Sequence, residues 1–191
     1  MQYPKTRTDS TIDQYHGVQV ADPYRWLEDA DSDETAAWVH EQNELSASYL
    51  SAIPARAGFK KRLEALWDFQ RRSTILHRGN AWFQFRNSGL ENQDVLYVMD
   101  SPRGDGRVLL DPNALSTDGT AALNAWSISD DGRWLAYAVS RSGSDWQDWK
   151  VREVSTARDL PETLSWSKFS GAAWLPDGSG FFYGRYPEPK E

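Results

Sequence analysis

The spacing of apolar residues changes near residue 70 and divides the chain into two parts. Before that point apolar residues recur at helical intervals, and after it they alternate with polar residues as in half-buried strands. The first part predicts helices over Asp31–Ser51 and Ala55–Phe69, with Pro54 ending one and opening the next. Residues 1–30 predict an extended, turn-rich arm, because breakers such as His16-Gly17 interrupt it.

The beginning of the first helix carries capping signals. Asp31 is the expected N-cap, and Glu34, three residues later, completes a capping-box pattern. The arm that precedes it holds more large apolar groups than a free tail would, including Tyr15, Tyr24 and Trp26. We therefore expect the arm to pack along another surface.

The second part predicts a series of short strands separated by turns that contain glycine. These strands are Ala81–Arg86, Val95–Met99, Arg107–Leu110, Trp134–Val139, Trp149–Val154, Phe169–Trp174 and Gly180–Arg185.

A repeat is visible within this part. Asp131-Gly132 and Asp177-Gly178 each follow a large apolar residue and precede an aromatic strand, and Arg78-Gly79 is a weaker copy. The three glycines lie roughly 50 residues apart, a period typical of β-propeller blades with four strands each. Each Asp-Gly turn would reverse the chain between the first two strands of a blade. The chain would hold two blades and begin a third, so we expect it to be a piece of a longer protein, because a propeller needs about four to eight blades to close.

Charge and composition narrow the classes of function. The net charge is −7 and no basic stripe is present, which argues against nucleic acid as a partner. The chain has no cysteine, no apolar leader and no apolar run near the ~18 residues of a membrane span. These features favour a cytoplasmic protein without a membrane partner.

No catalytic pattern stands out. The nucleophile elbow of an α/β-hydrolase, G-x-S-x-G, does not occur, and Gly178-Ser179-Gly180 is better interpreted as a hairpin turn. The three histidines, His16, His40 and His77, have no metal-ligand spacing and no paired carboxylate.

Several local strings, in the same order along the whole chain, resemble the prolyl oligopeptidase family of serine peptidases. The most specific is the arm motif D-P-Y-x-W-L-E-D at residues 22–29. The others include Tyr15-His16-Gly17, Asn92-Gln93-Asp94-Val95-Leu96-Tyr97-Val98, Leu110-Asp111-Pro112-Asn113, Ser142-Gly143-Ser144-Asp145-Trp146 and Lys168-Phe169-Ser170.

The resemblance implies a mixed fold of two parts. Residues 1–70 would be an N-terminal arm and helices that belong to an α/β-hydrolase domain. Residues 71–191 would form the first two blades, and the start of a third, of a seven-bladed β-propeller that restricts access to short peptides. The implied reaction is hydrolysis on the carboxyl side of proline by a Ser, Asp and His. All three would lie outside this chain, in the remainder of the same peptidase, and no cofactor or metal would be needed.

The resemblance also singles out two substrate-binding residues. Phe169 matches a propeller phenylalanine that contacts the peptide two residues before the proline, while the alternative is a phenylalanine of the blade core. Asp145 matches an aspartate near the active-site cavity, while the alternative is a turn or capping aspartate. Gly171-Ala172 follows where the family also has bulkier residues, which leaves the shape of that subsite open.

Two other functions compete with this interpretation. One is a non-catalytic propeller module that binds a protein, and the other is an oligopeptidase of the same superfamily with different specificity. The arm motif favours an enzyme over a free-standing propeller, and the two strings that contain Asp145 and Phe169 favour the proline-specific branch.

Overall fold

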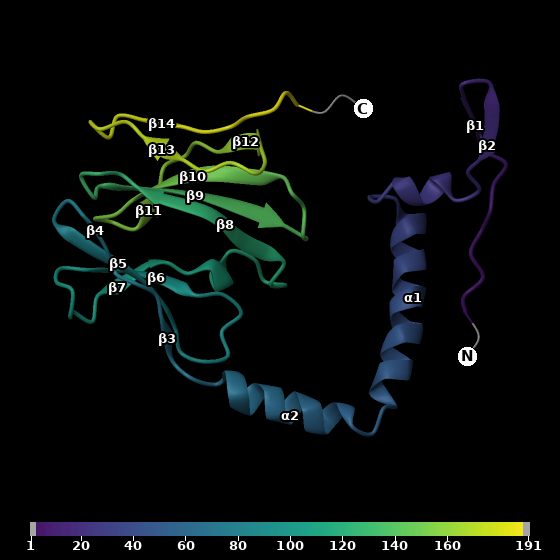
Figure 1. The fold of residues 1–191 in the computed structure, drawn as a ribbon, viewed down its shortest axis with the longest axis horizontal. Coiled ribbons are helices and arrows are strands. Elements are labelled where there is room, and N and C mark those ends of the chain that lie inside the picture. Colours follow the sequence, from purple (N-terminus) through teal and green to yellow (C-terminus); the bar gives the residue numbers. More distant parts are fainter. Residues whose placement is uncertain (1–2, 189–191) are drawn as a thin grey trace. The chain divides into compact units, whose positions relative to one another are not determined.

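The computed structural model describes residues 3–188, and the chain divides into two compact units, residues 1–63 and 64–191. Figure 1 shows the fold, with the helical unit in purple and blue and the sheets in teal to yellow. Among the described residues, no helix is both long and apolar enough to cross a bilayer.

The first unit contains a hairpin and helices. Strands β1 (Ile12–Tyr15) and β2 (Val18–Ala21) pair antiparallel, so part of the predicted arm is a hairpin turning at His16-Gly17. A 3-10 helix, η1 (Arg25–Glu28), leads to α1 (Asp33–Ser51), and the following α2 (Arg56–Trp67) contains the boundary to the second unit.

The arm contacts the start of α1 through polar groups, whereas Tyr15 and Tyr24, two of the apolar residues on which the prediction rested, are exposed. Trp26 Nε1 donates to the carbonyl oxygen of Arg7 at 3.0 Å, and the Arg7 guanidinium lies 4.8 Å above the Trp26 ring. Arg7 Nε also lies 2.6 Å from a carboxylate oxygen of Glu34. Trp38 Nε1 donates to Thr6 Oγ1 at 3.0 Å.

The predicted cap of α1 is wrong by one residue. Ser32, not Asp31, is the N-cap, because its extended backbone lets its hydroxyl accept the backbone N–H of Thr35 at 3.2 Å. Glu34 completes no capping box, since its carboxylate pairs with Arg7 instead.

The second unit holds two five-stranded antiparallel sheets and a third, two-stranded one. The first sheet contains β3 (Arg71–Arg72), β4 (Leu76–Arg78), β5 (Ala81–Asn87), β6 (Val95–Met99) and β7 (Arg107–Leu110). After the 3-10 turn η2 (Pro112–Ala114), the second contains β8 (Ala121–Ile128), β9 (Trp134–Arg141), β10 (Gln147–Glu153), β11 (Arg158–Asp159) and β12 (Leu164–Ser167). The third is the hairpin of β13 (Ala173–Trp174) and β14 (Phe181–Phe182).

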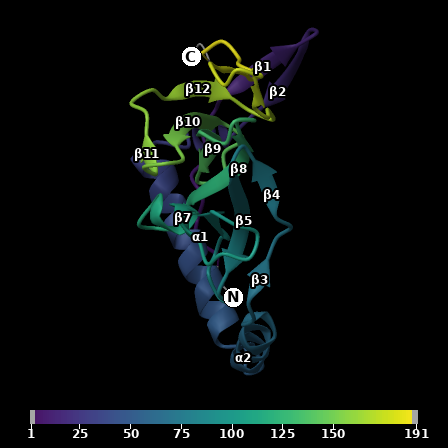
Figure 2. The same cartoon turned by 90° about the vertical axis from the view of Figure 1, so that its left-hand side faces the viewer.

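The outer edge of the second sheet is divided between two short strands. Both β11 and β12 pair with β10, near its end and near its beginning respectively. In Figure 2 they lie on the β10 side of the sheet, away from β8.

The sheets stack face to face, and β9 is buried on both faces. Leu135, Tyr137 and Val139 pack with residues of the first sheet in one apolar cluster. Ala136 and Ala138 join Trp149 and the residues of the β13–β14 hairpin in a second cluster. This alternation explains why six consecutive residues of β9 are buried.

Gly132 and Gly178 lie in turns between the first and second strands of their sheets, as predicted, whereas Gly79 lies between β4 and β5, after the short strand β3. The turns of Gly79 and Gly132 touch. Gly79 N donates to the carbonyl oxygen of Asp130 at 3.0 Å. Gly79 and Gly132 have φ of +55° and +75°, and a Cβ on Gly132 would lie 2.5 Å from the carbonyl oxygen of Arg78. The glycines are therefore needed both for their backbone conformation and for the close approach of neighbouring turns.

Several strand predictions differ from the structure. The segment predicted as Gly180–Arg185 forms a strand only at Phe181–Phe182, and the short strands β3, β4, β11 and β12 were not predicted. The segment predicted as Phe169–Trp174 forms a strand only at Ala173–Trp174, because Phe169 has a φ of +52° that no strand allows. The eight-residue strand β8 was not predicted, since its alternation depends on small alanines and a register shift between Leu123 and Ala125 breaks it.

Candidate functional site

The two residues singled out by the sequence lie at the same end of the second sheet. Asp145 is in the turn between β9 and β10, and Phe169 follows β12. Gln147 of β10 pairs in register with Ser167 of β12, so Asp145 and Phe169 each lie just beyond that pair. Both residues are exposed.

Phe169 is exposed to solvent in this chain. Its relative exposure within this chain is 78%, so neither of the two apolar clusters described above covers it. It is held on a turn in which both Trp166 and Phe169 have positive φ, of +64° and +52°. Large residues adopt this conformation at a cost, so the surroundings must impose it.

A buried polar network fixes this turn. Ser167, which is fully buried, donates its hydroxyl to the carbonyl oxygen of Gly184 at 2.7 Å and accepts the Trp149 indole N–H at 3.1 Å. Gly184 N in turn donates to Ser170 Oγ at 2.7 Å, and Gln147 Nε2 donates to the carbonyl oxygen of Ser170 at 3.1 Å. The residues on both sides of Phe169 are therefore tied to β10 and to the segment after β14.

Asp145 lies in a turn, but its carboxylate caps nothing. The capping acceptor is Ser144 Oγ, which accepts the backbone N–H of Trp146 at 3.1 Å. Within residues 3–188 the Asp145 side chain makes no hydrogen bond or ion pair.

Aromatic residues flank both candidate residues, and sequence patterns alone did not point to them. Trp146, Trp166 and Tyr186 form an aromatic cluster in which Trp146 meets Trp166 at 5.7 Å and Tyr186 at 6.0 Å, both edge to face. Lys168 Nζ lies 4.6 Å from the Trp146 ring and 5.2 Å from the Tyr186 ring. The sequence offered two signals, a high count of 10 tryptophans and the place of Trp146 in the Ser142–Trp146 string, and neither showed which rings meet.

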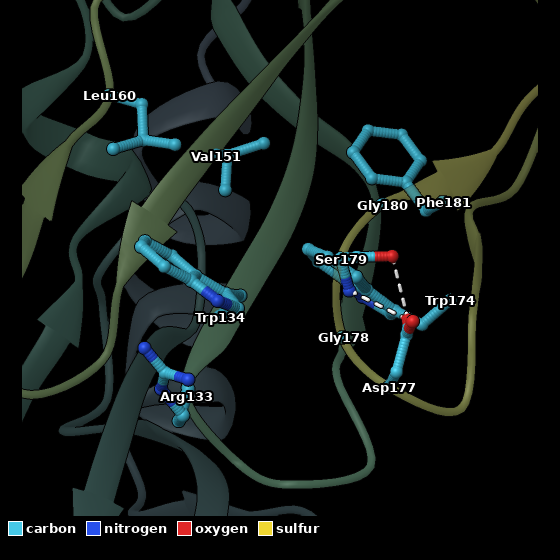
Figure 3. A pocket seen from close by; sticks show the side chains of 10 residues that line it. All are labelled: Arg133, Trp134, Val151, Leu160, Trp174, Asp177, Gly178, Ser179, Gly180 and Phe181. Carbon is cyan, nitrogen blue, oxygen red and sulfur yellow. Dashed lines mark hydrogen bonds between the residues drawn. The ribbon is translucent and has the colours of Figure 1, made fainter.

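A pocket of about 360 Å³ lies at the opposite end of β9 from Asp145. Figure 3 shows it between the sheet residues Trp134 and Val151 and the β13–β14 hairpin with Trp174 and Phe181. Asp177 accepts both the backbone N–H and the hydroxyl of Ser179, at 3.0 and 2.7 Å. The hydroxyl hydrogen bond, more than the backbone one, lowers the pKa of the Asp177 carboxyl.

This pocket is a space between sheets and has no catalytic arrangement. Its lining contains no histidine, and the Ser179 hydroxyl is committed to Asp177 within a turn, as predicted for Gly178-Ser179-Gly180. We therefore place the candidate site at the turns that carry Asp145 and Phe169.

Another set of ionisable groups with shifted pKa values links strands and lies away from these turns. Burial raises the pKa of Tyr137, whose hydroxyl donates to Asp159 Oδ2 at 2.8 Å. Burial also opposes ionisation of Asp159, but its hydrogen bonds to Arg152 and Tyr137 outweigh burial and lower its pKa. Arg152 further donates to the carbonyl oxygen of Leu109 at 2.8 Å, which ties the second sheet to the first. These partners indicate a structural role.

The histidines lie in separate places. His16 occupies the turn of the β1–β2 hairpin, His40 lies 3.2 Å from Glu44 on α1, and His77 stacks on Trp82 at 4.1 Å. Within the described chain no group of three His, Cys, Asp or Glu side chains is placed to hold a metal ion.

Comparisons with known proteins identify the family. The family model described as "Prolyl oligopeptidase, N-terminal beta-propeller domain" matches residues 3–191. A prolyl endopeptidase of Elizabethkingia meningoseptica is 41% identical over 191 residues, which are all of this chain and 27% of that protein. Prolyl oligopeptidase A of Galerina marginata is 38% identical over 97% of this chain and 29% of its own length.

Solved structures of prolyl endopeptidases and oligopeptidases also have a similar fold in the part that matches this chain. A prolyl endopeptidase superposes with a TM-score of 0.83 at 34% identity, over 98% of this chain and 28% of that one. Prolyl oligopeptidase B from Galerina marginata, bound to a 25mer macrocyclization substrate, superposes with a TM-score of 0.76 at 34% identity, over 98% of this chain and 30% of that one. The chain thus spans less than a third of these relatives. Since the family model covers almost every residue, the chain belongs to the prolyl oligopeptidase family and matches its N-terminal β-propeller domain.

Proposed function

We propose that this chain is the N-terminal part of a serine-type endopeptidase that hydrolyses short peptides on the carboxyl side of proline. The observation that carries the proposal is the pair of exposed residues, Asp145 and Phe169, at one end of the second sheet in a chain of this family. Residues 1–70 would belong to the α/β-hydrolase domain, and the sheets would begin the propeller that limits access to short peptides.

The chemistry would be acyl transfer to water. A serine attacks the carbonyl carbon of the proline, a histidine takes the proton from the serine, and the histidine gives it to the leaving amine as the C–N bond breaks. Water, deprotonated by the same histidine, then releases the acyl group from the serine, while an aspartate orients the histidine. Hydrogen-bond donors stabilise the oxyanion of the tetrahedral intermediate. In this proposal all of these groups come from the rest of the peptidase, so residues 1–191 alone would be inactive.

Phe169 and Asp145 would contribute to substrate binding. An exposed phenylalanine on a fixed turn offers an apolar face to a side chain two residues before the proline. A contact between two aromatic rings contributes about 0.5–1.5 kcal/mol beyond the area that it buries. The unpaired carboxylate of Asp145 would attract the amino group of a short peptide, an interaction that salt weakens.

The test is a cleavage assay on the intact protein that contains this chain. Two fluorogenic peptides are compared, identical except that one has proline and the other arginine before the scissile bond. We expect cleavage of the proline peptide and its loss after treatment with a fluorophosphonate, which reacts with active serines. Preference for arginine would support the alternative specificity within the superfamily. No cleavage of either peptide would refute the proposal and favour a binding module.

The binding role is tested by substitution in the same protein. Phe169→Ala should raise KM for a peptide with phenylalanine two residues before the proline, and leave a glycine peptide unchanged. Asp145→Asn should raise KM for peptides with a free amino terminus, and the effect should shrink as salt is added.

A further inference from the structure

The turn that exposes Phe169 is also held by contacts of the Lys168 side chain with two aromatic rings. The Lys168 ammonium lies over two neighbouring rings, 4.6 Å from the centre of the Trp146 ring and 5.2 Å from the centre of the Tyr186 ring. Within residues 3–188 no carboxylate lies within 4.0 Å of it, so its positive charge is stabilised by ring faces. A cation over an aromatic face is attracted by the negative potential of the ring.

These contacts connect three separate segments of the chain. Trp146 belongs to the β9–β10 turn that carries Asp145, and Tyr186 lies beyond β14. Tyr186 N also donates to the carbonyl oxygen of Trp166 at 2.8 Å. The Lys168 side chain therefore links the turn of Phe169 to the β9–β10 turn and to the segment after β14. The backbone hydrogen bond between Tyr186 and Trp166 is a separate link to that segment.

Because Lys168 directly precedes Phe169 in the chain, the contacts of its ammonium also restrict the backbone of Phe169. Lys168 is half-buried and directed to the rings, whereas the next residue is 78% exposed. Because Trp166 and Phe169 both have positive φ, the turn has a conformation that large residues do not adopt unaided. Releasing the ammonium would allow the turn to relax toward ordinary backbone angles and would change the direction of the Phe169 ring.

We propose that Lys168, held over the rings of Trp146 and Tyr186, is a positioning residue that fixes Phe169 for apolar side chains of the substrate. The role of Phe169 as a substrate contact rests on the proposed function, whereas the fixing of the turn by Lys168 does not.

The first test needs no substrate. Amide hydrogen exchange is measured in the intact protein for Lys168→Met, which keeps an apolar stem but removes the charge, and for Lys168→Arg, which keeps the cation. We expect Lys168→Met to speed exchange at Gly184 and Tyr186, whose N–H groups bond to the turn, by about two- to fivefold, the size of one exposed cation–π contact. Lys168→Arg should stay near wild type, and so should Arg103→Met, which removes a charge at another exposed turn. Unchanged exchange in Lys168→Met would overturn the proposal.

The second test uses the cleavage assay. Lys168→Met should raise KM about two- to fivefold for the peptide with phenylalanine two residues before proline, with kcat and the glycine peptide unchanged. In a Phe169→Ala background the same substitution should have no further effect, since the two act as a unit. Equal losses on both peptides would overturn the positioning role. If Phe169→Ala itself changes no selectivity, the proposed subsite fails, and the exchange result still decides whether Lys168 fixes the turn.

Discussion

Replacing Gly79 by alanine should destabilise the contact between the first two sheets. Gly79 has a φ of +55°, and an added Cβ would lie well inside van der Waals contact with the carbonyl oxygen of Asp131 and 2.5 Å from its carbonyl carbon. These are backbone atoms of the next turn, so no side chain can rotate away to make room. The shift that relieves the clash also threatens the hydrogen bond from Gly79 N to the carbonyl oxygen of Asp130.

The magnitude follows from three costs and one gain. The left-handed conformation costs a non-glycine residue about 1–2 kcal/mol, and displacing packed neighbours costs about 1–3 kcal/mol. A lost backbone hydrogen bond adds about 1 kcal/mol, while the reduced freedom of the unfolded chain returns about 0.4–1 kcal/mol. The net loss of stability for Gly79→Ala is therefore about 2–5 kcal/mol.

Gly119→Ala is the matched control. Gly119 has a φ of +73°, but the nearest atom to its added Cβ is the side-chain nitrogen of Asn92 at 3.7 Å, an ordinary contact. It should lose only the conformational part, about 1 kcal/mol or less. Both variants are compared by native-state hydrogen exchange of β5 and β9 amides in the intact protein. Equal protection in the two variants would refute the idea that neighbouring turns pack through their glycines.

Two further outcomes follow from the described contacts. Hydrogen bonds lower the pKa of Asp159 in the folded protein, so its contribution to stability is present above its unfolded pKa near 3.9 and is lost as the pH falls through the lower, folded value. Asp159→Asn should therefore lower the free energy of unfolding at pH 7 by about 1–3 kcal/mol, because Arg152 loses a charged partner. When the urea midpoint of unfolding is plotted against pH, the decrease toward acid should be shallower in the variant. A decrease as steep as in the wild type would contradict this. Ser32→Ala should lower the stability of the folded protein by about 1 kcal/mol because it removes the cap of α1, whereas Asp31→Ala should change it little. Both are measured by thermal unfolding followed by the circular dichroism of the helices. A larger loss in Asp31→Ala would show that Asp31 is the cap.

Strands bounded by strong turn residues were predictable from the sequence. β6 and β7 begin and end where the alternation predicted, because the Gly104-Asp105-Gly106 turn between them leaves little choice. β8 was missed, since alanines give a weak alternation and its burial comes from the sheets on either side. Such a strand forms because residues from neighbouring sheets pack against it, and those partners cannot be identified from a single sequence.

The candidate site was predictable only in part. A family resemblance named Asp145 and Phe169, but their nearness depends on the pairing of Gln147 with Ser167, which no local pattern specifies. Phe169 was placed in a strand because it is aromatic and lies among apolar residues. The positive φ that displays it is imposed by hydrogen bonds from distant segments, such as the one between Gly184 and Ser170.

The divided outer edge of the second sheet has a consequence for association between molecules. A long, straight edge strand presents a row of unpaired N–H and C=O groups to which a strand of another molecule can add. Here that row is broken between β11 and β12, and Pro161 in the break has no N–H to donate. The edge therefore offers an incoming strand only short, separate stretches, which protects this rim of the sheet against intermolecular β-pairing.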